Sequence, residues 1–399
     1  MQRGGNPPMM RVPMAPGPPF KHVQPPRPQF IPHIPFDLAQ CETFFPAAHP
    51  PSDDKSFTDL LLKRNTELTP SAMEAQACTS LVTKFSTIID SLIINPSSFE
   101  AAHIEEMRMV GSYKKNTMMT GRNVADVVLL LRTLPTKEAV DSLGNKILEE
   151  LRQQTDVTVR TTYTVTTKPY GFDIIATSGL MATKNLQVAS IKAHITTVPS
   201  NLKKLDPELH LDPKIQQGGL ASIRHVRWFE ENATHTSIKV LIRLLKDLKQ
   251  RFEGFQHLSP WIIDLLAHYA IMVNPNRTPL PINQAFKRVL QLLSAGLFLP
   301  GSAGITDPCE QGNVRVHTAL TLEQQDEVCC TAQTLLRVLS HGGYKQILGY
   351  DGGSKQNIAM EMTIWDNIVV APSDKAYEKL EKTEGDESGI PDGETPDGG

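Results

Sequence analysis

The sequence predicts an α+β fold, with a mixed sheet and helices in the first half and a mostly helical second half. Stretches rich in Val, Ile and Thr alternate with helical spacings between about residues 69 and 199. After residue 200, helical spacings dominate. The two ends, residues 1–30 and 372–399, contain too few large apolar side chains to offset the entropy cost of ordering them, so we expect disordered tails.

Helices and strands alternate in the first half, which we take as an α/β part of about residues 69–199. Its first helix is predicted to begin with Thr69 as N-cap and Pro70 at the first helical position. A second helix starts at Thr136. The run that begins at Val124 is continuously apolar after one Asp, which is typical of a buried central strand. The predicted strands cover residues 105–110, 124–131, 157–165 and 187–198.

The second half, about residues 200–350, is predicted to be helical. Ser259 is a favourable N-cap before Pro260, and Thr321 forms a capping box with Gln324. A Gly-Gly pair ends the last long helix. The five predicted helices cover residues 214–232, 236–252, 260–274, 282–297 and 322–340.

Charge is distributed unevenly along the chain. The formal net charge is −3, but the part before Ser52 carries +2 and the part from Pro372 carries −6. The middle is therefore close to neutral. A domain that binds duplex nucleic acid by itself usually has a strong positive excess, so composition argues against that function for the folded part.

The cysteines and the hydropathy pattern give no sign of a metal cluster or a membrane segment. The five cysteines form no CxxC pair and no other metal-ligand spacing, which indicates reduced thiols. We find no apolar stretch long enough to span a bilayer, and expect no membrane association.

One pair of motifs points to phosphate chemistry. An apolar residue precedes Gly111 and Ser112, and Asp126 follows on the next predicted strand. Gly111 lets the backbone approach a phosphate, and the Ser112 hydroxyl with nearby amides can bind phosphate oxygens. A nucleotidyltransferase of the polymerase-β type has this arrangement, with two acids separated by one residue on the strand. Here the first acid is replaced by Val124.

The replaced acid decides what the site can do. Nucleotidyl transfer uses two magnesium ions, held by three carboxylates on adjacent strands, and a Val side chain cannot ligate a hard cation. The third acid belongs on the strand at 190–198, where the in-phase position is predicted to be His194. Asp173 is the alternative, and would restore a second acid without replacing the first. Asp126 alone could hold one hydrated magnesium through nucleotide phosphates, but not two.

An α/β part followed by a helical part is also the layout of template-independent nucleotidyltransferases. Beyond this layout, long segments closely resemble the DZF family, whose domain is nucleotidyltransferase-like, and the match runs from about residue 31 to 377. The segments that carry the resemblance are residues 31–37, 61–65, 110–115, 123–126, 197–199, 202–211, 227–232, 241–247, 297–301 and 304–309. A DZF domain over residues 31–370 is therefore expected.

The resemblance implies a function in RNA regulation without catalysis. It implies a subunit that forms a heterodimer with a larger DZF protein of the nuclear factor 90 type, which carries double-stranded-RNA-binding domains. Transcription and RNA processing, stability and translation would be regulated, in the nucleus and in a cytoplasmic fraction. RNA would be bound mainly through the partner, and association with DNA stays open. No cofactor is required, although a nucleoside triphosphate with magnesium could bind without turnover.

The helical half is expected to carry the dimer interface. Candidate residues are Phe286, Leu290, Leu293 and Leu297, together with the helix at 322–339. The alternative for each of them is a place in the chain's own core, because one apolar helical stripe serves either purpose.

Two other functions remain open from the sequence. One is an active template-independent nucleotidyltransferase, which needs a carboxylate from elsewhere to replace Val124. The other is autonomous RNA or DNA binding through basic helix faces, for which a solvated surface is the simpler explanation. The basic residues concerned are Arg224, Arg227, Lys239, Arg243, Lys246 and Lys249.

Overall fold

The computed structural model describes residues 31–41, 54–154, 159–180, 186–350, 364–365 and 368–369. The predicted tails, residues 1–30 and 372–399, lie outside these ranges. The chain divides into two units, Met1–Pro32 and His33–Gly399, and the helices and strands described all lie in the second.

A five-stranded mixed sheet forms the α/β half, as predicted. Its spatial order is β1-β2-β5-β4-β3, in which β2 and β5 are parallel and the other neighbours are antiparallel. The strand β4 was not predicted separately. The strands are β1 (Ile104–Val110), β2 (Val124–Leu131), β3 (Val159–Lys168), β4 (Gly171–Leu180) and β5 (Leu186–Thr197).

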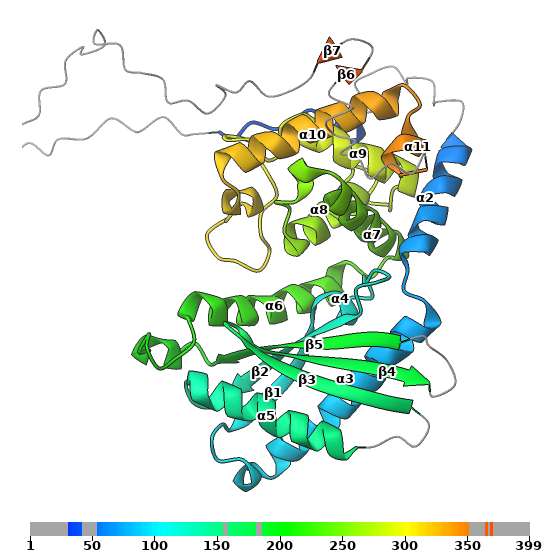
Figure 1. Ribbon diagram of the computed structural model, residues 1–399. Helices are drawn as coiled ribbons and strands as arrows, with labels where there is room; N and C mark the ends of the chain where they lie inside the picture. Colours follow the sequence, from blue (N-terminus) through cyan, green and yellow to red (C-terminus); the bar gives the residue numbers. More distant parts are fainter. Residues whose placement is uncertain are drawn as a thin grey trace, which may run out of the picture. The chain divides into compact units, whose positions relative to one another are not determined.

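Helices cover both faces of this sheet (Figure 1). The helices α3 (Ala72–Ile94) and α5 (Lys137–Gln153) pack on one face, and α6 (Pro213–Asn232) packs on the other. Successive side chains of β2 point to opposite faces of the sheet. Ala125, Val127 and Leu129 are buried in the core under α3 and α5, whereas Asp126 and Val128 point to the opposite face. The sheet therefore places Asp126 on the side of α6 and the helical half.

The helix α3 begins later than predicted. Its N-cap is Ser71, not Thr69. The Ser71 hydroxyl accepts a hydrogen bond from the Glu74 amide, and the Glu74 carboxylate accepts one from the Ser71 amide. By length and composition α3 could cross a membrane, contrary to the expectation from the sequence. Seven of its apolar residues are buried in the sheet core.

A helix that was not predicted precedes α3. This helix, α2 (Asp54–Leu68), packs on the helical half through contacts with α7 and α9. A short α1 (Leu38–Cys41) lies before it, and α4 (Gly111–Lys114) follows β1.

The helical half contains four of the five helices predicted for the second half of the chain, whereas the helix predicted at 214–232 is α6 and packs on the sheet. They are α7 (Thr236–Arg251), α8 (Pro260–Met272), α9 (Ile282–Ser294) and α10 (Leu322–Ser340), followed by the short α11 (Tyr344–Ile347). The caps Ser259 and Thr321 are confirmed. Two short strands, β6 (Ile364–Trp365) and β7 (Ile368–Val369), pair with each other.

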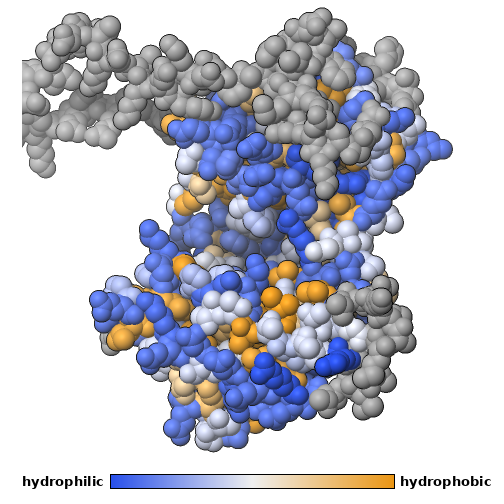
Figure 2. Space-filling view, in the orientation of Figure 1, coloured by the Kyte–Doolittle hydropathy of each residue, from blue (hydrophilic) through white to orange (hydrophobic). Residues whose placement is uncertain are grey.

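The four candidate dimer-interface residues lie in the chain's own core, which is the alternative that the sequence left open. Phe286, Leu290, Leu293 and Leu297 are each no more than 2% exposed, and all belong to the core of the helical half. Phe57 of α2 covers this stripe, with its ring 5.9 Å from that of Phe286. On the face shown in Figure 2, most of the surface of the helical half is hydrophilic, while hydrophobic surface gathers over the sheet.

Candidate nucleotide-binding cleft

A cleft of about 800 Å³ lies between the sheet and the helices α7 and α8. It is lined by Ser112, from the turn at Gly111 and Ser112 (the Gly-Ser turn), and by Val124 and Asp126 from β2. The Gly-Ser pair and the strand that carries Asp126 therefore meet, as predicted. The remaining lining residues are Thr117, Met118, Met119, Arg122, Lys192, Lys246, Lys249, Gln250, Gln256, Pro260 and Ile263.

Gly111 is required where β1 turns into α4. Its φ is +67°, in the left-handed region that L side chains rarely adopt. A Cβ at this position would also overlap Oδ2 of Asp126. The turn and the acid are thus in direct contact, which fixes the position of Asp126 at the wall of the cleft.

Lys246 from α7 reaches the same turn. Its Nζ donates to the Ser112 hydroxyl at 2.8 Å and to the Thr117 carbonyl at 2.9 Å. Burial, with smaller effects from Lys115 and Arg243, lowers the pKa of Lys246 to about 8. At neutral pH the ammonium remains mainly protonated and sits where a phosphate would contact Ser112.

Carboxylates are scarce in the cleft. Among the lining residues that the structure describes, Asp126 is the sole acid, and Val124, the residue for which the sequence motif predicts an acid, lies two residues earlier on the same strand. Four cations, by contrast, line the same cleft: Arg122, Lys192, Lys246 and Lys249. A cavity with this balance favours a polyanion over a pair of free divalent cations.

Two residues of β5 lie near Asp126, and neither is acidic. In the β2–β5 register, Lys192 is opposite Asp126, and His194 is opposite Val128. The His194 Nε2 atom still lies 3.5 Å from Oδ1 of Asp126, so the predicted residue is close to the site. Lys192, which was not among the predicted site residues, lines the cleft together with Asp126.

Asp173, the alternative to His194 as the predicted third-acid residue, is on β4 opposite Lys192. Its Oδ1 accepts the Tyr170 hydroxyl at 2.6 Å, and the Tyr170 ring packs against His194 at 4.7 Å. Burial and the bond to Asp173 raise the pKa of Tyr170 well above its usual value. The strand β5 thus separates Asp173 from Asp126, with Lys192 between them in the register.

Three of the six basic residues proposed for autonomous nucleic-acid binding make contacts inside the structure. Arg243 donates to the carbonyls of Asn116 and Met118, Lys249 donates to the Leu258 carbonyl, and Lys246 donates to Ser112. Arg224 and Arg227 are exposed, and they pair with Glu310 and Glu231. Internal contacts and acidic partners therefore argue against one open basic face.

Solved structures with a similar fold have low sequence identity to this chain. CdnC of E. coli MS115-1 in complex with HORMA-deltaN is 13% identical with a TM-score of 0.47, and the match covers 78% of this chain and 95% of that one. A cytoplasmic RNA terminal U-transferase is 12% identical with a TM-score of 0.44, over 74% and 97% of the two chains. A chain of the GLD-2/RNP-8 complex is 9% identical with a TM-score of 0.45, over 74% and 98%.

Family models give the clearer result. The model of the DZF N-terminal domain matches residues 10–234, which include the sheet, α6 and the Gly-Ser turn. The model of the DZF C-terminal domain matches residues 237–371, which include α7 to α11. The N-terminal model alone matches more than half of the chain, and the chain therefore belongs to the DZF family.

Proposed function

We propose that this DZF protein is a non-catalytic subunit of an RNA-regulatory complex, of the interleukin enhancer-binding factor 2 type. The observation that carries the proposal is the composition of the cleft, where Val124 takes the place of an acid and Asp126 is accompanied by four cations. Two magnesium ions need several oxygen ligands in fixed positions. One carboxylate beside Lys192 does not supply them.

A primer-extension assay tests the absence of catalysis. The purified chain is incubated with an RNA primer, each labelled nucleoside triphosphate, and magnesium or manganese. We expect no extension above a blank, for wild type and for Asp126→Asn alike. Extension by the wild type that is lost in Asp126→Asn would overturn the proposal, because it would show that Asp126 works with acids from another source.

The cleft is suited to hold a nucleotide without turnover. Ser112 and Lys246 are already joined by a hydrogen bond at the turn, and Lys192 faces the same space. We expect ATP to bind without requiring magnesium, and to bind more weakly as salt rises, because the contacts are cationic. Equilibrium binding of a fluorescent ATP analogue, with chelator or with magnesium, measures this. Lys192→Glu should abolish binding, and Lys239→Glu, on the same helix as Lys246 but not among the residues that line the cleft, serves as the control.

Pairing with a larger DZF protein that carries double-stranded-RNA-binding domains, of the nuclear factor 90 type, is the second part of the proposal. Two features support it. Five of the six basic residues have internal contacts or acidic partners, which favours RNA binding mainly through a partner, and apolar side chains are exposed beside the helical half. The side chains of Phe36, Leu38 and Val273 are exposed. Gln40 donates to the Val273 carbonyl, so the segment that carries Phe36 and Leu38 lies next to Val273. Regulation of transcription and of RNA processing, stability and translation, in the nucleus and a cytoplasmic fraction, would follow from the complex.

Co-expression with such a partner tests the pairing. We expect a complex of one chain each by size-exclusion chromatography with light scattering. The double variant Phe36→Glu with Leu38→Glu should weaken it, whereas Ile94→Glu, at an exposed apolar site on the α/β half, should leave it intact. A wild-type chain that stays monomeric in the presence of the partner would reject heterodimer formation without affecting the catalytic argument.

A further inference from the structure

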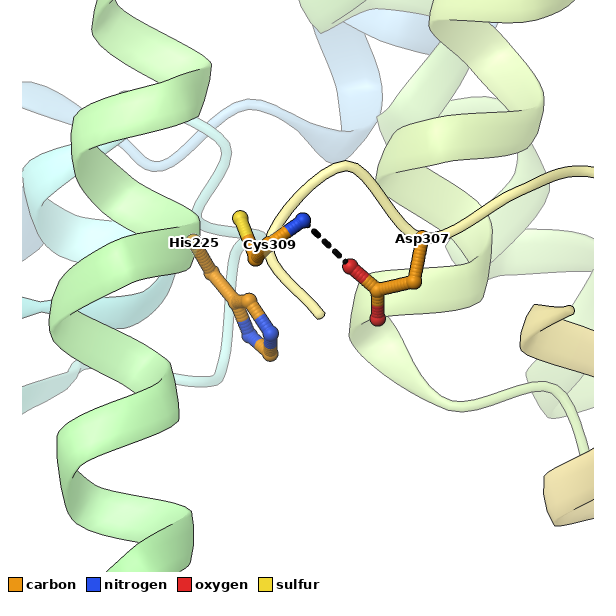
Figure 3. A group of neighbouring side chains, drawn as sticks. All are labelled: His225, Asp307 and Cys309. Atoms are coloured by element: carbon orange, nitrogen blue, oxygen red, sulfur yellow. Dashed lines mark hydrogen bonds between the residues drawn. The ribbon is translucent and has the colours of Figure 1, made fainter. Parts of the chain in front are cut away.

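Three side chains with metal-ligating atoms converge outside the cleft. His225 comes from α6, and Asp307 and Cys309 come from the loop between α9 and α10 (Figure 3). One donor atom from each lies within 4.8 Å of the others. Because the histidine is far from the other two in sequence, the spacing of the cysteines gave no sign of this group.

Hydrogen bonds and ring contacts hold the three side chains in place. Asp307 accepts the Trp261 indole N–H at 2.9 Å through Oδ2 and the Cys309 amide at 2.8 Å through Oδ1. The His225 ring stacks on Trp261 with the ring centres 3.9 Å apart. Metal ligands in proteins are usually oriented by such outer contacts, and each Asp307 oxygen retains a further lone pair for an ion.

The nearby cations are already paired. Lys115 forms a 2.6 Å ion pair with Asp264, and Arg224 pairs with Glu310. Both cations thus have acidic partners other than Asp307. The charges of Asp307 and of a Cys309 thiolate together match a divalent ion.

The three side chains are of the kinds that bind zinc. A neutral imidazole offers a nitrogen lone pair, a carboxylate offers oxygen, and a thiol binds as the thiolate, so an ion that binds there must displace the Cys309 thiol proton.

We propose that His225, Asp307 and Cys309 bind a zinc ion, with water as the fourth ligand. Sulfur and imidazole ligands select zinc over magnesium or calcium, which need oxygen. Zinc bonds of about 2.0–2.3 Å place tetrahedral donors roughly 3.5 Å apart, so shifts of the donor atoms by about an ångström, through side-chain rotation, would complete the site.

The ion would join the two DZF domains. His225 belongs to the N-terminal domain, and Asp307 and Cys309 belong to the C-terminal domain. Zinc bound to both would oppose their separation. This role does not depend on the proposed lack of catalysis or on the proposed partner.

Metal titration of the full chain tests the site. The purified protein is stripped with a chelator, and zinc alone is added while metal content and thermal unfolding are followed. We expect about one tightly bound zinc per chain and a rise in the unfolding temperature that chelator reverses. A stripped wild-type chain that retains no zinc after gel filtration would overturn the proposal.

Variants identify the ligands. Cys309→Ser and His225→Gln should each weaken zinc binding by at least about 100-fold, since a direct ligand is lost. Cys330→Ser, which removes a half-buried thiol from α10, is the matched control and should bind as wild type. Cobalt gives a second readout, because a thiolate-to-cobalt charge-transfer band should be present in wild type and Cys330→Ser and absent in Cys309→Ser. Equal zinc affinity in wild type, Cys309→Ser and His225→Gln would reject this assignment.

Discussion

A buried ion pair joins the two halves of the protein, and removing its acid should be costly. Nζ of Lys115, just after α4, lies 2.6 Å from Oδ2 of Asp264 on α8, and the two side chains are only 8% and 3% exposed. Besides this acid, the ammonium contacts the rings of Phe229 and Trp261, each 5.4 Å away. Asp264→Asn leaves a cation buried without its counter-charge.

The cost of such a change is about 3–5 kcal/mol, because an unpaired buried charge keeps its desolvation penalty. That is a large part of the roughly 5–15 kcal/mol that stabilises an ordinary domain. With an m value of about 3 kcal/mol/M in urea, the unfolding midpoint should fall by roughly 1 to 1.7 M. Tryptophan fluorescence and far-ultraviolet circular dichroism should report the same transition if the halves unfold together.

Two controls separate the buried charge from general effects of mutation. Glu150→Gln breaks the more exposed pair with Lys146 on α5, and should cost no more than about 1 kcal/mol. The double variant Lys115→Met with Asp264→Leu removes both charges, and should recover most of the lost stability. If Asp264→Asn unfolds within about 1 kcal/mol of wild type, the ion pair does not hold the halves together.

Three further predictions follow from single positions. Gly111→Ala should lose more stability than the roughly 1–2 kcal/mol expected for Gly121→Ala. Both glycines have positive φ, but only at Gly111 does the Asp126 carboxylate occupy the space where a Cβ would lie. Chemical denaturation measures the stability of both variants. Phe286→Ala should cost about 3–5 kcal/mol in the isolated chain, and a stable variant that fails only in pairing would contradict its burial. Burial lowers the folded-state pKa of Lys246 to about 8, so the unfolded chain binds more protons than the folded chain between pH 8 and about pH 10.5. The free energy of unfolding of the wild type should therefore rise with pH in that range relative to that of Lys246→Met. A pH-independent difference between the two proteins would refute this.

The fold was predictable wherever a local signal was strong. The capping residue Ser259 and the apolar strand at 124–131 were found because each depends only on neighbouring residues. The helix α2 was missed because only Phe57, Leu61 and Leu68 are buried in it, too few for a clear stripe, and contacts with α7 and α9 stabilise it.

Two errors were avoidable from the sequence. In β4, Phe172, Ile174 and Ala176 are buried at alternate positions, which is a recognisable strand pattern. At the start of α3, Ser71 and Glu74 have the spacing of a capping box, which is a stronger signal than Thr69 before a proline.

The cleft was only half predictable. The approach of Gly111 to Asp126 follows from a short motif on adjacent strands. Lys192 was accessible to the same reasoning, because it shares a strand face with His194. Lys246 was not, since α7 belongs to the other half of the chain and only tertiary packing brings it to Ser112.

The contacts of the Gly-Ser turn bear on how such motifs should be interpreted. Gly111 is needed because its backbone is left-handed and Asp126 fills the space beside it, and Ser112 is needed to accept from a buried lysine. Both contacts are internal to the chain, so the turn by itself does not distinguish an active site from a structural one. More informative are positions with no such contacts, such as Val124, where the nucleotidyltransferase motif predicts an acid.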